Sequence, residues 1–197
     1  MKKFSIILVL CFLTLNSSYG QQRVKVNAIL VDSSFDAASL LKLHNAVKVL
    51  DSIYNSETFA QAVLNADFNV GNFGLTNYQI LELIRSGSDN YINKPKDSSI
   101  DIRVKLFDEY FGHRNFGITD MNTRVTKTHR CYILHNDIKC YISHLAHEYM
   151  HEIGFLDERT WAFGTKTKSV PYKIGNIIET LIGNTSQCIA KDETCTK

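Results

Sequence analysis

Proline is scarce in this chain, and no apolar run is long enough to cross a bilayer comfortably. Only 2 of the 197 residues are proline and 11% are aromatic, a composition that argues against a disordered or linker-rich protein. The apolar run at Phe4–Leu15 has 12 residues, whereas a membrane-spanning helix needs about 20. The chain contains no internal repeat. Its length and its hydrophobic content of 44% predict one globular domain with a substantial core.

The N-terminus has the pattern of a secretory signal peptide. Two lysines precede the apolar run, and small residues follow it at Ser18 and Gly20, as a signal peptidase prefers. We therefore expect a signal peptide at residues 1–20 and a single domain at residues 21–197. The mature protein is expected to be secreted or periplasmic. An uncleaved membrane anchor is the alternative interpretation of the same segment.

Loss of the signal peptide would remove the excess of positive charge. The formal net charge of the whole chain is +2, and it falls to 0 because both charges of the signal are lysines. No global basic surface is then left to attract nucleic acid or an anionic membrane. We expect neither nucleic acid nor, after signal removal, a membrane as a partner.

Four cysteines remain after Cys11 leaves with the signal: Cys131, Cys140, Cys188 and Cys195. An even number of cysteines in an exported protein favours disulfides. The spacings of nine and seven residues do not fit the usual zinc knuckle, in which two cysteines lie two to four residues apart. Four cysteines allow three pairings, of which the two local pairs are the preferred prediction.

Hydrophobic periodicity predicts alternating strands and helices. Strands are expected at Arg23–Val31, Ile100–Phe107, Arg130–Leu134 and within His113–Asp120. Helices are expected at Phe35–Asn65 with a break at residues 55–57, at Asn77–Arg85 after the capping Thr76, at Cys140–Ile153 and at Lys173–Ile182. This order implies an α/β or α+β domain of two or three layers.

The chain contains one H-E-x-x-H motif, formed by His147, Glu148 and His151. On a helix the two histidines lie one turn apart on the same face, where both imidazoles can bind one metal ion. Glu148 is then close enough to act on a water that the metal activates. Apolar residues cover much of the circumference of this predicted helix, so that we expect it to be buried.

A catalytic zinc site needs three protein ligands, and two residues are candidates for the third. Gly154 can adopt a left-handed conformation and end the helix abruptly, after which Asp157 can return to the metal. Glu179, on a helix farther along the chain, is the alternative ligand. We prefer Asp157, because Gly154 has a clear purpose only if the chain turns back.

The extended motif H-E-x-x-H-x-x-G-x-x-D at His147–Asp157 resembles the signature of the metzincin zinc peptidases. Asp157 stands where most of them have a third histidine, a replacement typical of snapalysin-type members. The resemblance implies an α+β, metzincin-like zincin fold with a small mixed twisted sheet, a long N-terminal helix, a central active-site helix and a short C-terminal subdomain. The chain lacks the methionine of the metzincin methionine turn, since Met150 is its last methionine. Ser169–Tyr172 occupies the plausible position of that turn. Tyr172 could bind metal or the oxyanion there, and a core or surface tyrosine without such a role is the preferred interpretation.

The resemblance implies a secreted, monomeric zinc metalloendopeptidase that acts on proteins or peptides with one catalytic Zn²⁺. In this hypothesis His147, His151 and Asp157 hold the zinc and Glu148 is the general base. A catalytically inactive zinc-binding scaffold that acts as a protein-binding module is the alternative function. An accidental motif in a protein without metal is the third possibility.

Overall fold

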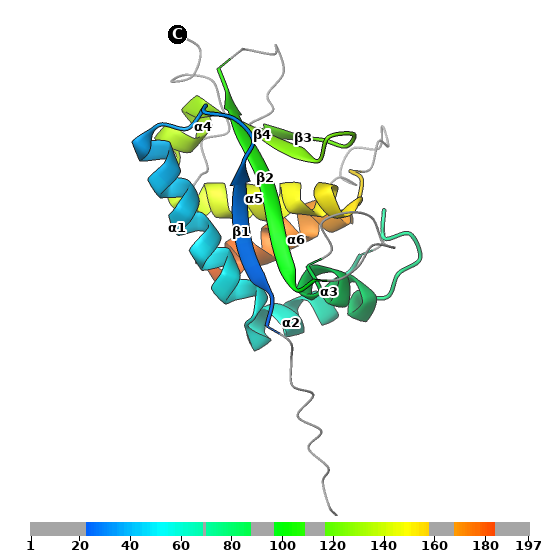
Figure 1. Cartoon of the computed structure of the whole chain (residues 1–197). Helices are drawn as coiled ribbons and strands as arrows, with labels where there is room; N and C mark the ends of the chain where they lie inside the picture. Colours follow the sequence, from blue (N-terminus) through cyan, green and yellow to red (C-terminus); the bar gives the residue numbers. More distant parts are fainter. Residues whose placement is uncertain (1–22, 69, 88–96, 109–116, 158–167, 184–197) are drawn as a thin grey trace, which may run out of the picture.

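The computed structural model describes residues 23–68, 70–87, 97–108, 117–157 and 168–183. A small sheet forms one layer of this part of the chain, and the longer helices lie on one side of it (Figure 1). The signal peptide expected at residues 1–20 lies outside the described residues. Within them, no helix is both long and apolar enough to span a membrane.

The sheet has four strands in the order β1-β2-β4-β3. They are β1 (Lys25–Leu30), β2 (Ser99–Phe107), β3 (Gly117–Asp120) and β4 (Val125–His129). β2 runs parallel to both β1 and β4, whereas β3 runs antiparallel to β4 at the edge. The described fold is therefore mixed, with a small open sheet, which is compatible with the expected α+β class.

The alternation of β2 determines which face of the sheet is covered. Its apolar residues are at most 5% exposed, and they are Ile100, Ile102, Val104 and Leu106. The charged residues between them point to the opposite face, as the period of two requires. The helices lie on the apolar side, and the strand expected at Ile100–Phe107 is confirmed.

Two N-terminal helices begin at side chains that cap their first turn. α1 (Ala37–Tyr54) starts at Asp36, whose carboxylate accepts a hydrogen bond from the backbone N–H of Ser39. α2 (Glu57–Leu64) starts at Ser56, which caps it in the same way. The predicted break at residues 55–57 is therefore confirmed and has a physical cause in this second cap.

A third helix and a short fourth one precede the motif. α3 (Asn77–Arg85) begins after Thr76, which forms a capping box with Gln79, as expected from the sequence. α4 (Arg130–His135) corrects a prediction, because a strand was expected at Arg130–Leu134. The strand of this region is β4, which ends at His129, immediately before α4. Its threonines alternate with lysine and its β-branched residues favour strand geometry, whereas the four apolar residues at 131–134 do not by themselves distinguish a strand from one helical turn.

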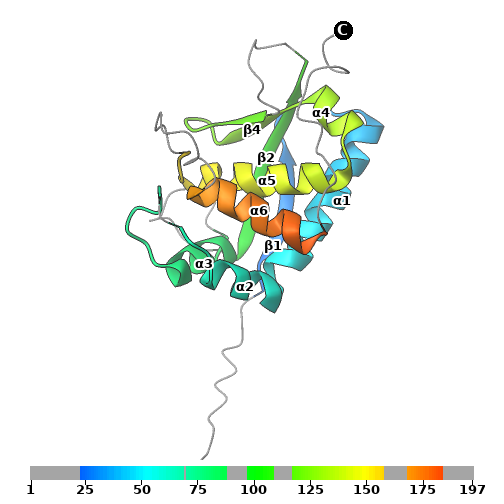
Figure 2. The ribbon, with the colours of Figure 1, turned by 180° about the vertical axis from the view of Figure 1, so that it is seen from behind.

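The motif lies on α5 (Ile138–Ile153), the central helix of the fold. The final helix, α6 (Val170–Leu181), packs on the side of α5 that faces away from the sheet (Figure 2). Gly175 lies in this contact, and a Cβ atom there would be 3.5 Å from the Cβ atom of His147, an ordinary van der Waals distance. α6 begins three residues earlier than predicted because Pro171 fits its first turn. Ser169–Tyr172 therefore forms the start of a helix rather than a turn.

Two of the cysteines, Cys131 and Cys140, lie within the described residues. Cys131 and Cys140 are each disulfide-bonded. Cys188 and Cys195 lie outside the described residues, so the pairing of the four stays open.

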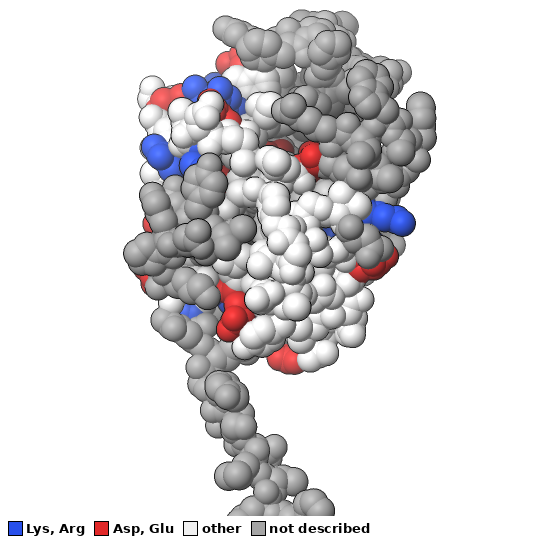
Figure 3. Space-filling view, turned by 90° about the vertical axis from the view of Figure 1, so that its right-hand side faces the viewer, with Lys and Arg blue, Asp and Glu red and all other residues white. Residues whose placement is uncertain are grey.

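On the face shown in Figure 3, the basic side chains of the described residues lie in small separate groups near the margins.

Candidate metal centre

The two histidines of the motif face each other across one turn of α5. Their ring centroids are 5.0 Å apart, and their Nε2 atoms lie 3.2 Å apart. The helix that holds them is fixed on most sides, because ten of its residues are buried, including Leu145, Ala146 and Tyr149. The predicted burial of the motif helix is thus confirmed.

Gly154 ends α5 and reverses the chain, as expected. Its φ of 118° and ψ of 2° are left-handed, a conformation that favours glycine. Its backbone N–H and that of Phe155 both donate to the carbonyl oxygen of Met150, which closes the last turn of the helix. The following residues then return toward the histidines.

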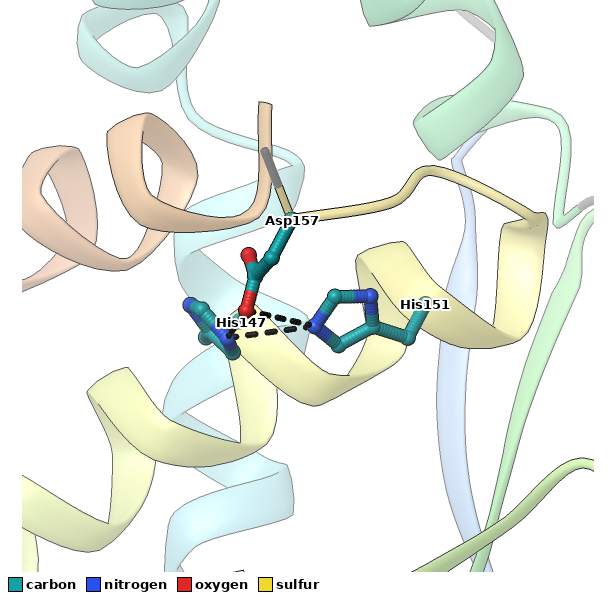
Figure 4. Close-up of side chains that lie close together, drawn as sticks. All are labelled: His147, His151 and Asp157. Atoms are coloured by element: carbon teal, nitrogen blue, oxygen red, sulfur yellow. Dashed lines mark hydrogen bonds and ion pairs between the residues drawn. The ribbon is translucent and has the colours of Figure 1, made fainter. Parts of the chain in front are cut away.

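Asp157 is brought to the histidines by this reversal (Figure 4). Its Oδ2 atom lies 3.6 Å from Nε2 of His151 and 3.8 Å from Nε2 of His147. One ligand atom from each residue lies within 4.8 Å of the other two. The three side chains therefore form a cluster that could hold a metal ion.

A backbone carbonyl fixes which nitrogen of His151 is available. Nδ1 of His151 lies 2.8 Å from the carbonyl oxygen of Phe155. Because a carbonyl only accepts hydrogen bonds, Nδ1 must carry a proton and donate it. Nε2, which faces His147 and Asp157, is then the nitrogen left to bind a metal.

The surroundings of the cluster set the charge of two of its members. Burial lowers the pKa of His147 to about 4, although the nearby charges of Glu148 and Asp157 act to raise it. This imidazole is therefore neutral at neutral pH. Burial alone would raise the pKa of Asp157, but its hydrogen bond with His151 and the neighbouring histidines bring it below the usual range. A neutral imidazole and an ionised carboxylate are the forms that bind metals.

Proton sharing with the carboxylate also affects His151. Burial would lower the pKa of His151, but its hydrogen bond with Asp157 and the charge of Glu148 raise it above the ordinary value. A proton on this imidazole therefore competes with a metal when the pH is low.

Glu148 points toward the edge of the sheet and is 5% exposed. Its Oε2 atom accepts a 2.7 Å hydrogen bond from the hydroxyl of Thr119 on β3. The same hydroxyl lies 2.9 Å from that of Thr126 on β4, which in turn donates to Glu152. The carboxylate of Glu148 is thereby held by β3, close enough to His147 and His151 for its charge to act on both imidazoles.

His144 supports Glu148 from the preceding turn of the helix. Its Nδ1 atom lies 3.7 Å from Oε1 of Glu148, and its Nε2 atom lies 3.2 Å from the hydroxyl of Thr128. The ring fills the space next to Gly117, where a Cβ atom would come within 2.5 Å of it. Burial, aided by the charge of His151, lowers the pKa of His144 to about 4, so that it is neutral at neutral pH.

The other sequence candidates lie in different places. Tyr172 packs edge-on against His147 with ring centroids 4.6 Å apart, and burial together with Asp157 and Glu148 raises the pKa of its phenol. Among the described residues, the cluster of possible metal ligands includes Asp157 and not Glu179. Glu179 lies near Tyr132 instead: burial, and to a lesser extent the charge of Glu179, raises the pKa of that phenol.

Sequence reasoning missed two residues that touch the site. Thr119 reaches Glu148 from β3, and the hydroxyl of Ser169 donates to Oδ1 of Asp157 over 3.4 Å. Neither belongs to a motif, and only the packing of β3 and α6 against α5 brings them close. The sole available signal was the alternation of β3, which places Thr119 inward and Ile118 outward.

Comparison of the chain with family models, with curated proteins and with solved structures gives no match. What the centre can do therefore follows from its own donor atoms and their surroundings. These are two imidazole nitrogens and one carboxylate oxygen that converge on one point, with a second carboxylate, that of Glu148, held beside them.

Proposed function

We propose that this chain is an exported zinc-dependent endopeptidase with a metzincin-like zincin fold. The observation that carries the proposal is the convergence of His147, His151 and Asp157 beside Glu148, whose carboxylate is held by Thr119. The antiparallel edge strand β3, the central motif helix and the left-handed end of that helix support the same assignment. The chain departs from the metzincin pattern by its missing methionine and by its third ligand.

The distances among the ligand atoms favour zinc. Zinc bonds of about 2.0–2.2 Å in a tetrahedron place neighbouring ligand atoms roughly 3.4 Å apart. The corresponding separations here are 3.2, 3.6 and 3.8 Å. Three protein ligands with nitrogen and oxygen donors are also the number found in catalytic zinc sites, which keep a fourth position open.

A zinc ion at these ligands would supply Lewis acidity, both to acidify a water and to polarise a peptide carbonyl. Glu148 would accept the proton of the attacking water and deliver it to the leaving amine. Its hydrogen bond with Thr119 keeps the carboxylate in place for both transfers. Tyr172, which stays protonated at neutral pH and lies against His147, is the candidate donor to the developing oxyanion.

The edge strand β3 suggests how a peptide would lie in the site. Among the described residues β3 pairs on one side only, with β4, and it also carries Thr119. An extended peptide can add to such an edge through backbone hydrogen bonds. Its scissile bond would then pass close to Glu148, which favours a protein or peptide substrate.

Cleavage of an unfolded protein such as casein tests this function. Wild-type protein should cleave it, a chelator should stop the reaction, and added zinc should restore it. Glu148→Gln should retain the metal and lose turnover by at least about 100-fold, because it removes the general base. Glu179→Gln, which changes a carboxylate outside the cluster, is the matched control and should stay active.

The same experiment separates the peptidase from the alternative scaffold. A protein that binds zinc but cleaves neither casein nor a peptide library would support the inactive binding module. Cleavage by Glu148→Gln at the wild-type rate would exclude the proposed mechanism.

A further inference from the structure

We propose that Ser169 is a positioning residue that restricts Asp157 to binding the metal through a single oxygen. The inference rests on the proposed metal site and concerns its geometry. It follows from three observations: the unequal partners of the two carboxylate oxygens, the direction in which the Ser169 hydroxyl donates its proton, and the anchoring of the Ser169 backbone.

The two oxygens of Asp157 have different partners. Oδ2 faces the Nε2 atoms of His147 and His151, at 3.8 and 3.6 Å. Oδ1 points away from the histidines and accepts the hydrogen bond of the Ser169 hydroxyl, 3.4 Å away. One oxygen is thus directed at the metal position while the other is engaged by the protein.

The hydroxyl of Ser169 does not form the capping hydrogen bond that its position at the start of a helix predicts. Ser169 is the N-cap residue of α6, and serine at this position normally accepts a hydrogen bond from the first turn of the helix. No side-chain cap bond forms here. The hydroxyl donates its proton to Oδ1 of Asp157, so that the described side-chain contact of Ser169 is with the candidate ligand and not with its own helix.

The backbone of Ser169 is held by a separate part of the chain. It forms a parallel bridge with Val70, in the segment between α2 and α3, and the residue is fully buried. The hydroxyl therefore reaches Oδ1 from a fixed point rather than from a mobile loop end. Fixed outer contacts of this kind orient metal ligands and tune metal affinity.

The consequence concerns the position that remains free at the metal. A carboxylate that binds through both oxygens occupies two coordination positions, whereas one that binds through Oδ2 alone occupies one. With Oδ1 engaged by Ser169, three protein atoms would hold the metal, and a fourth position would be left for water and substrate.

Ser169→Ala tests this role, with Ser143→Ala as the matched control. Ser143 also donates its hydroxyl across the α5–α6 contact, to the carbonyl oxygen of Gly175, but it does not touch the cluster. Zinc affinity, measured by competition with a chromophoric chelator, should fall about tenfold in Ser169→Ala and stay unchanged in Ser143→Ala. In the cobalt-substituted proteins, Ser169→Ala should shift from the intense visible absorption of four-coordinate Co²⁺ toward the weaker absorption of five-coordinate Co²⁺.

The outcomes separate this inference from the proposed function. If the wild type binds zinc, and Ser169→Ala has equal affinity and an unchanged cobalt spectrum, the role of Ser169 is excluded while the metal site stands. If the wild type binds no zinc, the proposed function fails and this inference fails with it. A structure of the zinc-loaded wild type that shows both Asp157 oxygens bonded to the metal would also overturn it, whether or not the variant folds.

Discussion

Nδ1 of His151 donates a hydrogen bond to the carbonyl oxygen of Phe155, 2.8 Å away and four residues along the chain. This contact joins the end of the motif helix to the segment that carries Asp157. It exists only because the chain reverses at Gly154, whose φ is 118°. The orientation of one candidate ligand and the return of another therefore depend on the same glycine.

Gly154→Ala should disturb this reversal, and Gly183→Ala provides the control. Gly183 also adopts a left-handed conformation after a helix, with φ of 80°, but lies beyond α6. Each substitution should lower the free energy of unfolding by about 1–2 kcal/mol, because an L side chain is strained there. Only Gly154→Ala should also weaken zinc binding, by about tenfold, as a calorimetric titration would show.

Equal zinc affinity in both glycine variants would contradict this account. It would mean that Asp157 reaches the histidines independently of the left-handed turn at Gly154.

Thr119→Val should separate the proposed role of Glu148 as general base from the proposed metal site. The substitution keeps the shape of the side chain and removes the hydroxyl that donates to Glu148. We expect kcat to fall about 10- to 100-fold, since a displaced catalytic group loses its alignment with the reacting atoms, while zinc content stays the same. Thr119→Ser retains the hydroxyl and should keep most of the activity. A Thr119→Val enzyme with the kcat of the wild type would show that the hydroxyl does not position Glu148.

The buried His144 makes the stability of the metal-free protein depend on pH. Burial, together with the charge of His151, lowers its folded-state pKa to about 4, whereas its ordinary value is 6.5. Between these values the unfolded chain binds a proton that the folded chain does not. The free energy of unfolding should therefore fall as the pH decreases from 6.5 toward 4, by at most roughly 3 kcal/mol from this residue.

His144→Gln removes this contribution, whereas the neighbouring His147, whose pKa is also lowered to about 4, retains its own. Urea unfolding in the presence of a chelator, from neutral to mildly acidic pH, should give a flatter pH dependence for the variant. Parallel curves for wild type and His144→Gln would show that His144 is not held neutral in the folded protein.

The local features of the site could be predicted from the sequence because each depends on a few neighbouring residues. The spacing of His147 and His151 places them one turn apart on any helix. Gly154 predicts the end of that helix, and in the structure this glycine adopts the expected left-handed conformation. Thr76 likewise marked the start of α3.

The remaining features depend on contacts between distant segments. Thr119 and Ser169 lie 29 and 21 positions from Glu148, and only the register of β3 and the docking of α6 bring them to the site. The segment Arg130–Leu134 was expected to be a strand and is a helix. Its apolar residues fit either structure, and the pairing of the preceding strand β4 with β2 determines where the strand ends and the helix begins. Sequence patterns therefore identify the candidate ligands but not the groups that orient them.

Zinc content of the purified protein tests the central claim most directly. Elemental analysis of wild type, Asp157→Ala and Glu179→Ala should give about one zinc ion per chain for the wild type and for Glu179→Ala, and a large loss for Asp157→Ala. A wild type without stoichiometric zinc would contradict the metal site. Loss of zinc in Glu179→Ala with retention in Asp157→Ala would contradict the assignment of the third ligand.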